Sequence, residues 1–139
     1  MNTIYQTKAV ATGGRDGKVV SEDGVLNLDV RVPKSMGGAG GAYTNPEQLF
    51  AAGYAACFDS ALNHIARLER KKIQSKVTAT VGLQMEEATG FNIIVTMDVE
   101  ITGVEKSVAQ ELLAKAHATC PYSKAIRNNV EVTLNLVEA

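Results

Sequence analysis

The two cysteines, Cys57 and Cys120, are the residues of this sequence best suited to chemistry. A thiolate is a strong nucleophile, and a second thiol can exchange with the oxidised product of the first. In a reducing compartment, two cysteines are rarely a structural disulfide, so they are either inert buried thiols or redox groups. The function of the chain depends on which description fits Cys57.

An inert thiol is the ordinary alternative for Cys57, because small residues on buried helices are usually packing residues. Three other positions favour a reactive site. Cys120 precedes a proline, which places it at the N-cap of a short helix, where amides and the helix dipole favour thiolate. Arg15 stands in a glycine turn, and Glu47 in the first helical turn could hold its guanidinium by a bidentate pair. Taken singly, each residue also has an ordinary structural explanation: Cys120 as a helix cap, Arg15 as an exposed cation in a turn, and Glu47 as an acid favoured by the helix dipole.

Alternating and helical patterns predict the elements that must position these residues. Strands are expected at 3–11, 18–21, 25–32, 77–85, 91–101 and 130–137, and the segments 77–85 and 91–101 should form a hairpin around Gly90. Helices are expected from Pro46 to the charged run ERKK at 69–72, over 105–118, and over the short segment 120–127. This order predicts one α+β domain over residues 1–139.

The long helix should begin with Asn45 as N-cap and Pro46 at the first helical position. Its segment 49–58, LFAAGYAACF, is apolar almost all round, which predicts burial on every side. Cys57 lies inside this segment. In the strand 25–32, alternation predicts a half-buried face formed by Leu26, Leu28, Val30 and Val32.

Composition excludes several classes of function. With 14 basic and 15 acidic residues the chain has no basic excess, so no nucleic-acid partner is expected. The N-terminus lacks a secretory signal and no segment is long enough to span a bilayer, so we expect a cytoplasmic protein without a membrane partner. His64 and His117 do not form a zinc spacing with the cysteines, and GGRDGK at 13–18 fails as a phosphate loop, so neither a metal nor a nucleotide is expected.

Three blocks of sequence resemble the organic hydroperoxide resistance branch of the Ohr/OsmC family. They are GGRDG at 13–17, GGAGGAYTNPEQLFAAGYAACF at 37–58 and CPYSKAIRNN at 120–129. The resemblance runs over the whole chain. It implies antiparallel sheets packed around central helices in an intertwined homodimer with two active sites at the subunit interface.

By this resemblance Cys57 is the peroxidatic thiol and Cys120 the resolving thiol, while Arg15 and Glu47 are the pair that poises Cys57. It further implies an organic hydroperoxide as substrate and dihydrolipoyl groups of lipoylated proteins as electron donors, with no bound cofactor. The chemistry is coherent, because a thiol buried among apolar groups needs a cation to ionise. Cys120 would then condense with the sulfenic acid before over-oxidation.

The aromatic residues Phe50, Tyr54 and Phe58 are expected to bind the organic part of the substrate, which would favour bulky hydroperoxides over hydrogen peroxide. One geometric difficulty remains. A straight helix would separate Glu47 from Cys57 by about 15 Å. Either the helix breaks near Gly53, or Arg15 and Glu47 reach Cys57 from a partner chain, which we favour.

Three alternatives remain open. A general thiol-disulfide oxidoreductase would need a C-x-x-C pair, which is absent. The related OsmC branch has similar chemistry with a different substrate balance, and the GGRDG and CPYSKAIRNN blocks favour the first branch. A non-catalytic dimer that binds small apolar molecules would retain its activity when Cys57 is replaced by serine.

Overall fold

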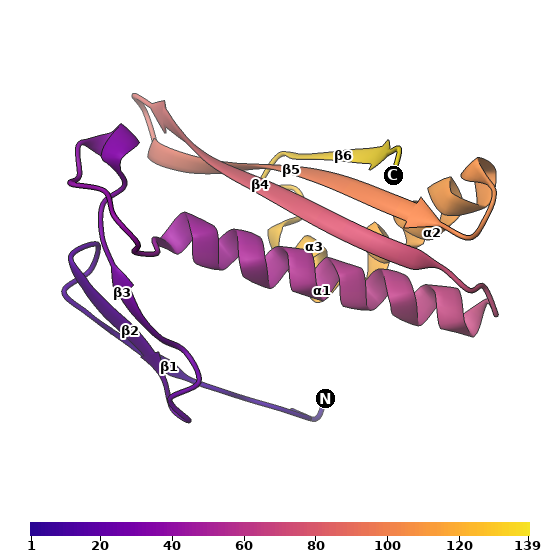
Figure 1. Ribbon diagram of the computed structural model, residues 1–139, viewed down its shortest axis with the longest axis horizontal. Coiled ribbons are helices and arrows are strands. Elements are labelled where there is room, and N and C mark those ends of the chain that lie inside the picture. The colour runs from indigo at the N-terminus through magenta and orange to yellow at the C-terminus, as the bar shows by residue number, and fades with distance from the viewer. The chain divides into compact units, whose positions relative to one another are not determined.

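The computed structural model describes residues 1–139, which form two compact units, Met1–Leu49 and Phe50–Ala139 (Figure 1). The first unit contains β1 (Ala9–Thr12), β2 (Gly17–Ser21), β3 (Asn27–Val30), a short 3-10 helix (Lys34–Met36) and the start of α1 (Pro46–Leu68). The second contains the rest of α1, β4 (Gln74–Glu86), β5 (Gly90–Thr102), α2 (Lys106–Thr119), α3 (Pro121–Ile126) and β6 (Val132–Val137). The α+β class is thus confirmed. That residues 1–139 are a single domain stays a prediction.

The first unit is a small antiparallel sheet in the order β1-β2-β3. The strand expected at 3–11 is shorter than predicted, because β1 pairs with β2 only from Ala9 onwards and residues 1–8 have no strand partner. The apolar face expected for the strand at 25–32 is also largely uncovered. Val30 is buried, but Leu26 and Leu28 are 45% and 38% exposed, because nothing in this unit packs over them.

The second unit is built on the predicted hairpin. β4 and β5 are long antiparallel strands, with Val77 opposite Val99 and Met85 opposite Phe91. One expectation was wrong: β6 lies parallel to β5, so this sheet is mixed rather than wholly antiparallel. The physical reason is the crossover through α2 and α3, which returns the chain to the same end of the sheet before β6 begins.

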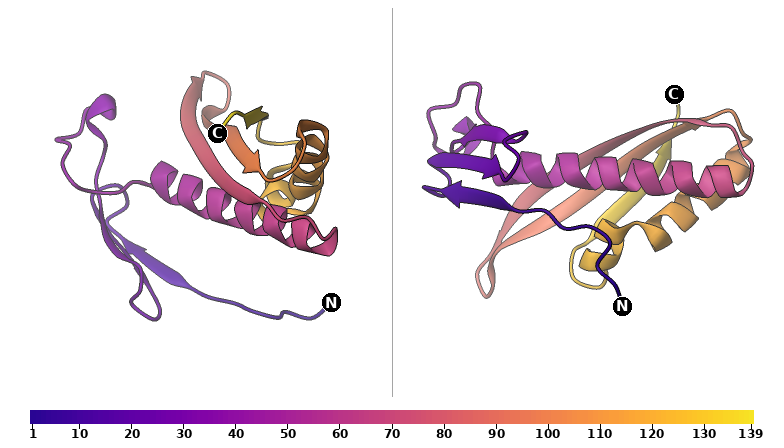
Figure 2. Two further views of the ribbon diagram at one scale, coloured as in Figure 1. Left: turned by 45° about the vertical axis from the view of Figure 1, so that its right-hand side comes forward. Right: turned by 90° about the horizontal axis from the view of Figure 1, so that it is seen from below.

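The core of the second unit lies on one face of this sheet, where α1 and α2 pack (Figure 2). The inward side chains of β5 meet one stripe of each helix. The fully or nearly fully buried residues are Tyr54, Phe58, Leu62 and Ala66 of α1, Val95, Met97 and Val99 of β5, Leu112, Leu113 and Ala116 of α2, and Cys120. The core therefore surrounds one of the two cysteines.

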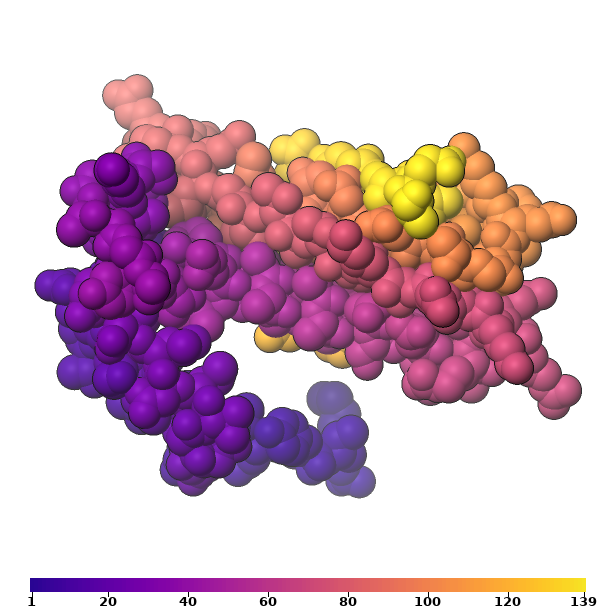
Figure 3. Space-filling model, viewed as in Figure 1, coloured from indigo at the N-terminus to yellow at the C-terminus, as the bar shows by residue number.

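Helix α1 begins as predicted, since the backbone N–H of Gln48 donates to Oδ1 of Asn45 at 2.9 Å. It runs without a break through Gly53, which excludes the kink that was the less favoured of the two alternatives. Burial on every side was wrong, because Ala52 and Ala56 are exposed. The helix buries a single stripe of residues four apart, and part of its surface stays visible in the space-filling view (Figure 3).

Candidate active site

The two cysteines lie side by side in the second unit. Cys57 is on α1 and Cys120 is the N-cap of α3, followed by Pro121 at the first helical position, as predicted. Their sulfur atoms are 3.7 Å apart, with the Cys120 thiol as donor, and both cysteines are free. Cys57 keeps some exposed surface whereas Cys120 has none. An incoming molecule can therefore reach Cys57 first.

The surroundings of Cys57 do not favour its ionised form. Burial raises the pKa of the Cys57 thiol, and the adjacent Cys120 raises it further, while a backbone hydrogen bond from Tyr122 lowers it. No cation of the second unit is among the groups that act on this pKa. The backbone amide of Tyr122, in the first turn of α3, thus acts on the Cys57 thiol. It does not offset burial, so a positive charge is still required.

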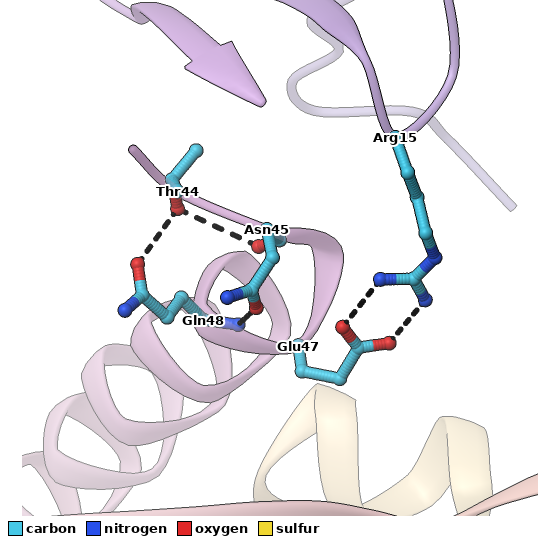
Figure 4. Close-up of polar contacts among 5 residues, drawn as sticks. All are labelled: Arg15, Thr44, Asn45, Glu47 and Gln48. Carbon is cyan, nitrogen blue, oxygen red and sulfur yellow. Dashed lines mark hydrogen bonds and ion pairs between the residues drawn. The ribbon is translucent and has the colours of Figure 1, made fainter. Parts of the chain in front are cut away.

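Arg15 and Glu47 form a bidentate ion pair in the first unit (Figure 4). Nη1 of Arg15 donates to Oε2 of Glu47 at 2.8 Å, and Nη2 donates to Oε1 at 2.5 Å. The hydrogen bond from Arg15 lowers the pKa of the Glu47 carboxyl, against the opposing effect of burial, and the same bond raises the pKa of Arg15. Both groups are therefore charged at neutral pH, and the guanidinium is held in one orientation.

The glycine turn that carries Arg15 is enforced by backbone packing. The N–H of Asp16 donates to the carbonyl of Gly13 at 3.0 Å, and Gly13 has a φ of 80°. A Cβ atom at Gly17 would lie 1.7 Å from the carbonyl oxygen of Thr12, which no side chain can tolerate. Only glycine fits this position, so the turn sets the direction of Arg15.

Arg31, which sequence reasoning missed, supports the same turn. Its Nη1 donates to the carbonyl oxygens of Gly17 at 2.8 Å and Val30 at 2.7 Å, and its Nε lies 3.3 Å from a carboxylate oxygen of Asp16. The guanidinium also lies 5.0 Å from the ring centroid of Tyr43. Arg31, Asp16 and Tyr43 line, with Arg15, a pocket of about 400 Å³ within the first unit. Arg31 lies in the strand expected at 25–32, and nothing in the neighbouring residues indicated this role.

The three aromatic residues expected to bind substrate all lie on α1. Tyr54 and Phe58 are fully buried in the core, and Phe50 is half-buried against Tyr54, with ring centroids 6.1 Å apart in an edge-to-face arrangement. In this chain their main contacts are with one another and with the core. Substrate binding by Phe50, Tyr54 and Phe58 stays a prediction.

A buried polar chain beside the cysteines was also missed from the sequence. The hydroxyl groups of Tyr54 and Ser123 are 2.7 Å apart, and Oγ of Ser123 is 2.9 Å from Nδ1 of His117. Burial lowers the pKa of His117, helped by Arg127. His64, by contrast, is exposed on α1. The CPYS block contains Ser123, but nothing in the sequence pairs it with Tyr54.

The structure contains no cluster of three or more histidine, cysteine or acidic side chains that could hold a metal ion. No helix combines the length and the apolar character needed to cross a bilayer. The reactive groups described above are the two thiols in the second unit and the Arg15–Glu47 ion pair in the first.

Comparison with known proteins decides the family. Residues 38–135 match the model of the family described as OsmC-like protein. The chain belongs to the OsmC-like protein family. Within this family it is 50% identical to the organic hydroperoxide resistance protein OhrA of Bacillus subtilis, with 97% of each chain covered. It is 45% identical to the organic hydroperoxide resistance protein of Xanthomonas axonopodis pv. citri, over 96% of this chain and 94% of the relative.

Solved structures of OsmC-like proteins have the same fold. An organic hydroperoxide resistance protein of Elizabethkingia anophelis matches with a TM-score of 0.94 and 49% identity over the whole of both chains. A protein from Legionella pneumophila described as an organic hydroperoxide resistance protein matches with a TM-score of 0.93 and 46% identity, over 97% of this chain and 98% of that one. The resemblance noted from the sequence is confirmed.

Proposed function

We propose that this chain is a cysteine-based peroxidase that reduces organic hydroperoxides to alcohols. The observation that carries the proposal is the sulfur pair, in which the partly exposed Cys57 lies 3.7 Å from the fully buried Cys120. A peroxide can reach the first sulfur, and the second is shielded until an oxidised product forms beside it. The names of the relatives, organic hydroperoxide resistance proteins, support this class of substrate.

In the first step the Cys57 thiolate attacks one oxygen of the hydroperoxide. The O–O bond breaks, the alkoxide takes up a proton and leaves as the alcohol, and Cys57 becomes a sulfenic acid. This step needs a cation, because burial raises the pKa of the Cys57 thiol. Arg15 meets the need, since a guanidinium does not lose its proton and can also stabilise the departing alkoxide. Glu47 keeps it aimed.

In the second step the Cys120 thiol attacks the sulfenic sulfur of Cys57. A disulfide forms and the sulfenic hydroxyl leaves with the thiol proton as water. An external dithiol, a dihydrolipoyl group on a lipoylated protein, then reduces the disulfide by thiol-disulfide exchange. Electrons arrive from this partner, so the cycle needs no bound cofactor. Both steps suit a reducing cytoplasm, where the cysteines return to free thiols.

We propose further that the functional unit is a homodimer and that Arg15 and Glu47 reach Cys57 of the partner subunit. The unbroken helix α1 supports this, because a kink at Gly53 was the other route. Uncovered apolar surface supports it too, since Val10, Leu26 and Leu28 are exposed in the first unit. A second copy of the chain would cover such a surface.

Phe50, Tyr54 and Phe58 form the apolar surroundings in which we place the organic group of the substrate. Burial of an alkyl chain contributes binding free energy that hydrogen peroxide cannot supply. We therefore expect organic hydroperoxides to be preferred over hydrogen peroxide. Equal or faster turnover of hydrogen peroxide would contradict this preference.

The deciding experiment is a peroxidase assay with an alkyl hydroperoxide, in which dihydrolipoamide is compared with thioredoxin as the reductant. We expect turnover with dihydrolipoamide. Cys57→Ser should abolish consumption of the hydroperoxide, while Cys120→Ser should retain one round of oxidation at Cys57. Full activity in Cys57→Ser would favour a non-catalytic binding protein and overturn the proposal.

A further inference from the structure

Besides the packing of the Tyr122 ring on Phe50 and Tyr54, two contacts between polar side-chain groups join α1 to the start of α3. The first is the pair of sulfur atoms of Cys57 and Cys120, 3.7 Å apart. The second is the 2.7 Å hydrogen bond between the hydroxyl groups of Tyr54 and Ser123. Tyr54 precedes Cys57 by three residues and Ser123 follows Cys120 by three, so each contact lies one helical turn from the other.

The hydroxyl contact is closed to water. Tyr54 and Ser123 both have no exposed surface, and every buried polar side-chain atom has a hydrogen-bond partner. Ser123 is fixed from a second side by Nδ1 of His117 at 2.9 Å. The carbonyl of His117 in turn accepts a 2.6 Å hydrogen bond from Nη2 of Arg127, just after α3. Ser123 therefore ties α3 to both α1 and α2.

Helix α3 needs such a contact. It spans only Pro121–Ile126, and so short a helix is not stable by itself. Its N-cap, Cys120, makes no side-chain capping hydrogen bond, because its thiol points to Cys57. Oxidation of Cys57 adds an oxygen atom to the sulfur that accepts this contact, so the thiol contact of the reduced state is lost. The Tyr54–Ser123 bond, whose two hydroxyl groups do not react, then remains as the hydrogen bond between side chains of α3 and α1, beside the packing of Tyr122 on Tyr54.

We infer that Tyr54 is a positioning residue for disulfide formation, holding Ser123 so that the Cys120 sulfur stays within reach of the oxidised Cys57. This inference rests on the proposed peroxidase function. Disulfide formation requires the two sulfurs to approach from 3.7 Å to about 2 Å, a movement small enough only if α3 does not drift. Burial raises the pKa of the Tyr54 hydroxyl, as do the neighbouring sulfurs of Cys120 and Cys57, so it stays a neutral hydrogen-bonding group.

The inference separates two steps that total activity would combine. The hydroxyl of Tyr54 bonds Ser123, while its ring belongs to the proposed substrate surroundings, so the oxidation of Cys57 to sulfenic acid does not depend on this hydrogen bond. The following condensation does, and the sulfenic acid that waits longer is open to a second hydroperoxide. That reaction gives a sulfinic acid at Cys57 and one more molecule of alcohol. Loss of the hydroxyl should thus appear as over-oxidation.

The test uses Tyr54→Phe, which keeps the ring in the core and removes only the hydroxyl. Reduced full-length protein is mixed with tert-butyl hydroperoxide at equal concentration and in excess, quenched with a thiol-alkylating reagent, and examined by intact mass spectrometry over time. The rate of the first oxidation is judged from Ser123→Ala, whose residue is outside the proposed substrate surroundings, and it should match wild type; Tyr54→Phe is judged by the step that follows. Disulfide formation should slow about fivefold, the factor expected for one lost neutral hydrogen bond, with a matching rise in sulfinic acid under excess.

Three further variants make the result decisive. Ser123→Ala removes the other hydroxyl and should show the same over-oxidation, while Ser123→Thr retains a hydroxyl and should restore much of the disulfide rate. Tyr5→Phe removes an exposed hydroxyl elsewhere and should behave as wild type. Thermal unfolding identifies any variant that does not fold, in which case the serine variants carry the test.

Two outcomes are distinguishable. Wild-type partition between disulfide and sulfinic acid in both Tyr54→Phe and Ser123→Ala, with normal oxidation of Cys57, overturns the positioning role and leaves the peroxidase intact. Wild-type protein that forms neither product with the hydroperoxide overturns the proposed function itself.

Discussion

The guanidinium of Arg15 and the carboxylate of Glu47 meet through two parallel N–H···O bonds of 2.8 and 2.5 Å. The pair joins a glycine turn between β1 and β2 to the first turn of α1, so both ends are held by backbone structure. This geometry gives the guanidinium one orientation and leaves it positively charged at any pH at which the protein is folded.

Replacing Arg15 should change the pH dependence of the peroxidase. Without this cation, burial leaves the pKa of the Cys57 thiol above its ordinary value, so thiolate forms only in alkaline solution. We expect Arg15→Ala to reduce the rate of hydroperoxide reduction at pH 7 by about two orders of magnitude. Part of the loss should be recovered as pH rises. Stopped-flow measurement of Cys57 oxidation between pH 5 and 10 detects both effects. Arg15→Lys keeps the charge without the bidentate pair, so its oxidation rate at pH 7 should lie between those of wild type and Arg15→Ala.

Glu47→Gln should weaken the site while leaving the positive charge of Arg15 in place. The glutamine keeps the size of the side chain but offers a single acceptor oxygen, so Arg15 loses one charge-assisted bond and its fixed orientation. We expect roughly a tenfold fall in kcat for an alkyl hydroperoxide, with a smaller change in KM. A variant with wild-type kcat would show that Glu47 has no part in orienting Arg15.

The titration of Glu47 sets an acid limit for the same pair. The hydrogen bond from Arg15 lowers the pKa of the Glu47 carboxyl below its ordinary value of 4.5, so the folded state binds this proton less readily than the unfolded chain. The stabilisation from the pair is therefore fully present above that value and is lost as pH falls through the lowered pKa. We expect the difference in unfolding free energy between wild type and Glu47→Gln, measured by urea denaturation, to be constant from pH 8 to pH 6 and to disappear in acid.

The glycine turn offers a test with a matched control. A Cβ at Gly17 would clash with the carbonyl of Thr12 at 1.7 Å, whereas a Cβ at Gly14 meets nothing within 4 Å. Gly17→Ala should therefore displace the turn and reproduce the kinetic defect of Arg15→Ala, while the condensation of Cys120 with already oxidised Cys57 keeps its wild-type rate. Gly14→Ala, at a φ of 58°, should cost only about 1 kcal/mol of stability and retain activity. Equal activity of the two variants would show that the turn does not position Arg15.

Sequence patterns predicted best what depends on neighbouring residues. The β4–β5 hairpin, the Asn45 cap of α1 and the place of Cys120 before α3 follow from alternation, capping and proline chemistry. The pairing of Arg15 with Glu47 was also expected, because a carboxylate in the first helical turn can hold a guanidinium by two parallel hydrogen bonds. Each of these is settled within a few residues or by one complementary pair of groups.

What the sequence could not predict depends on contacts made at a distance. The contact between Tyr54 and Ser123 requires the relative placement of α1 and α3, which no local pattern encodes. The parallel direction of β6 depends on where the crossover returns to the sheet. The exposure of Leu28 was missed for a related reason, since alternation predicts which face is apolar but not what covers it.

Mixing two inactive variants can show which subunit supplies the cation. Suppose that Arg15 acts on Cys57 of the partner subunit. A dimer of one Arg15→Ala chain and one Cys57→Ser chain then contains one complete site, in which the intact Cys57 of the first chain meets the intact Arg15 of the second. If Arg15 acts within its own chain, the same dimer contains none. The two chains are co-refolded in equal amounts and assayed with an alkyl hydroperoxide and dihydrolipoamide.

We expect the mixture to recover about a quarter of wild-type activity per chain, because half of the randomly formed dimers are mixed and each has one working site of two. Each variant refolded alone is the control and should be inactive. Size-exclusion chromatography with light scattering should show twice the mass of the chain for all samples. Mixed dimers without activity would show that Arg15 acts on the cysteine of its own chain.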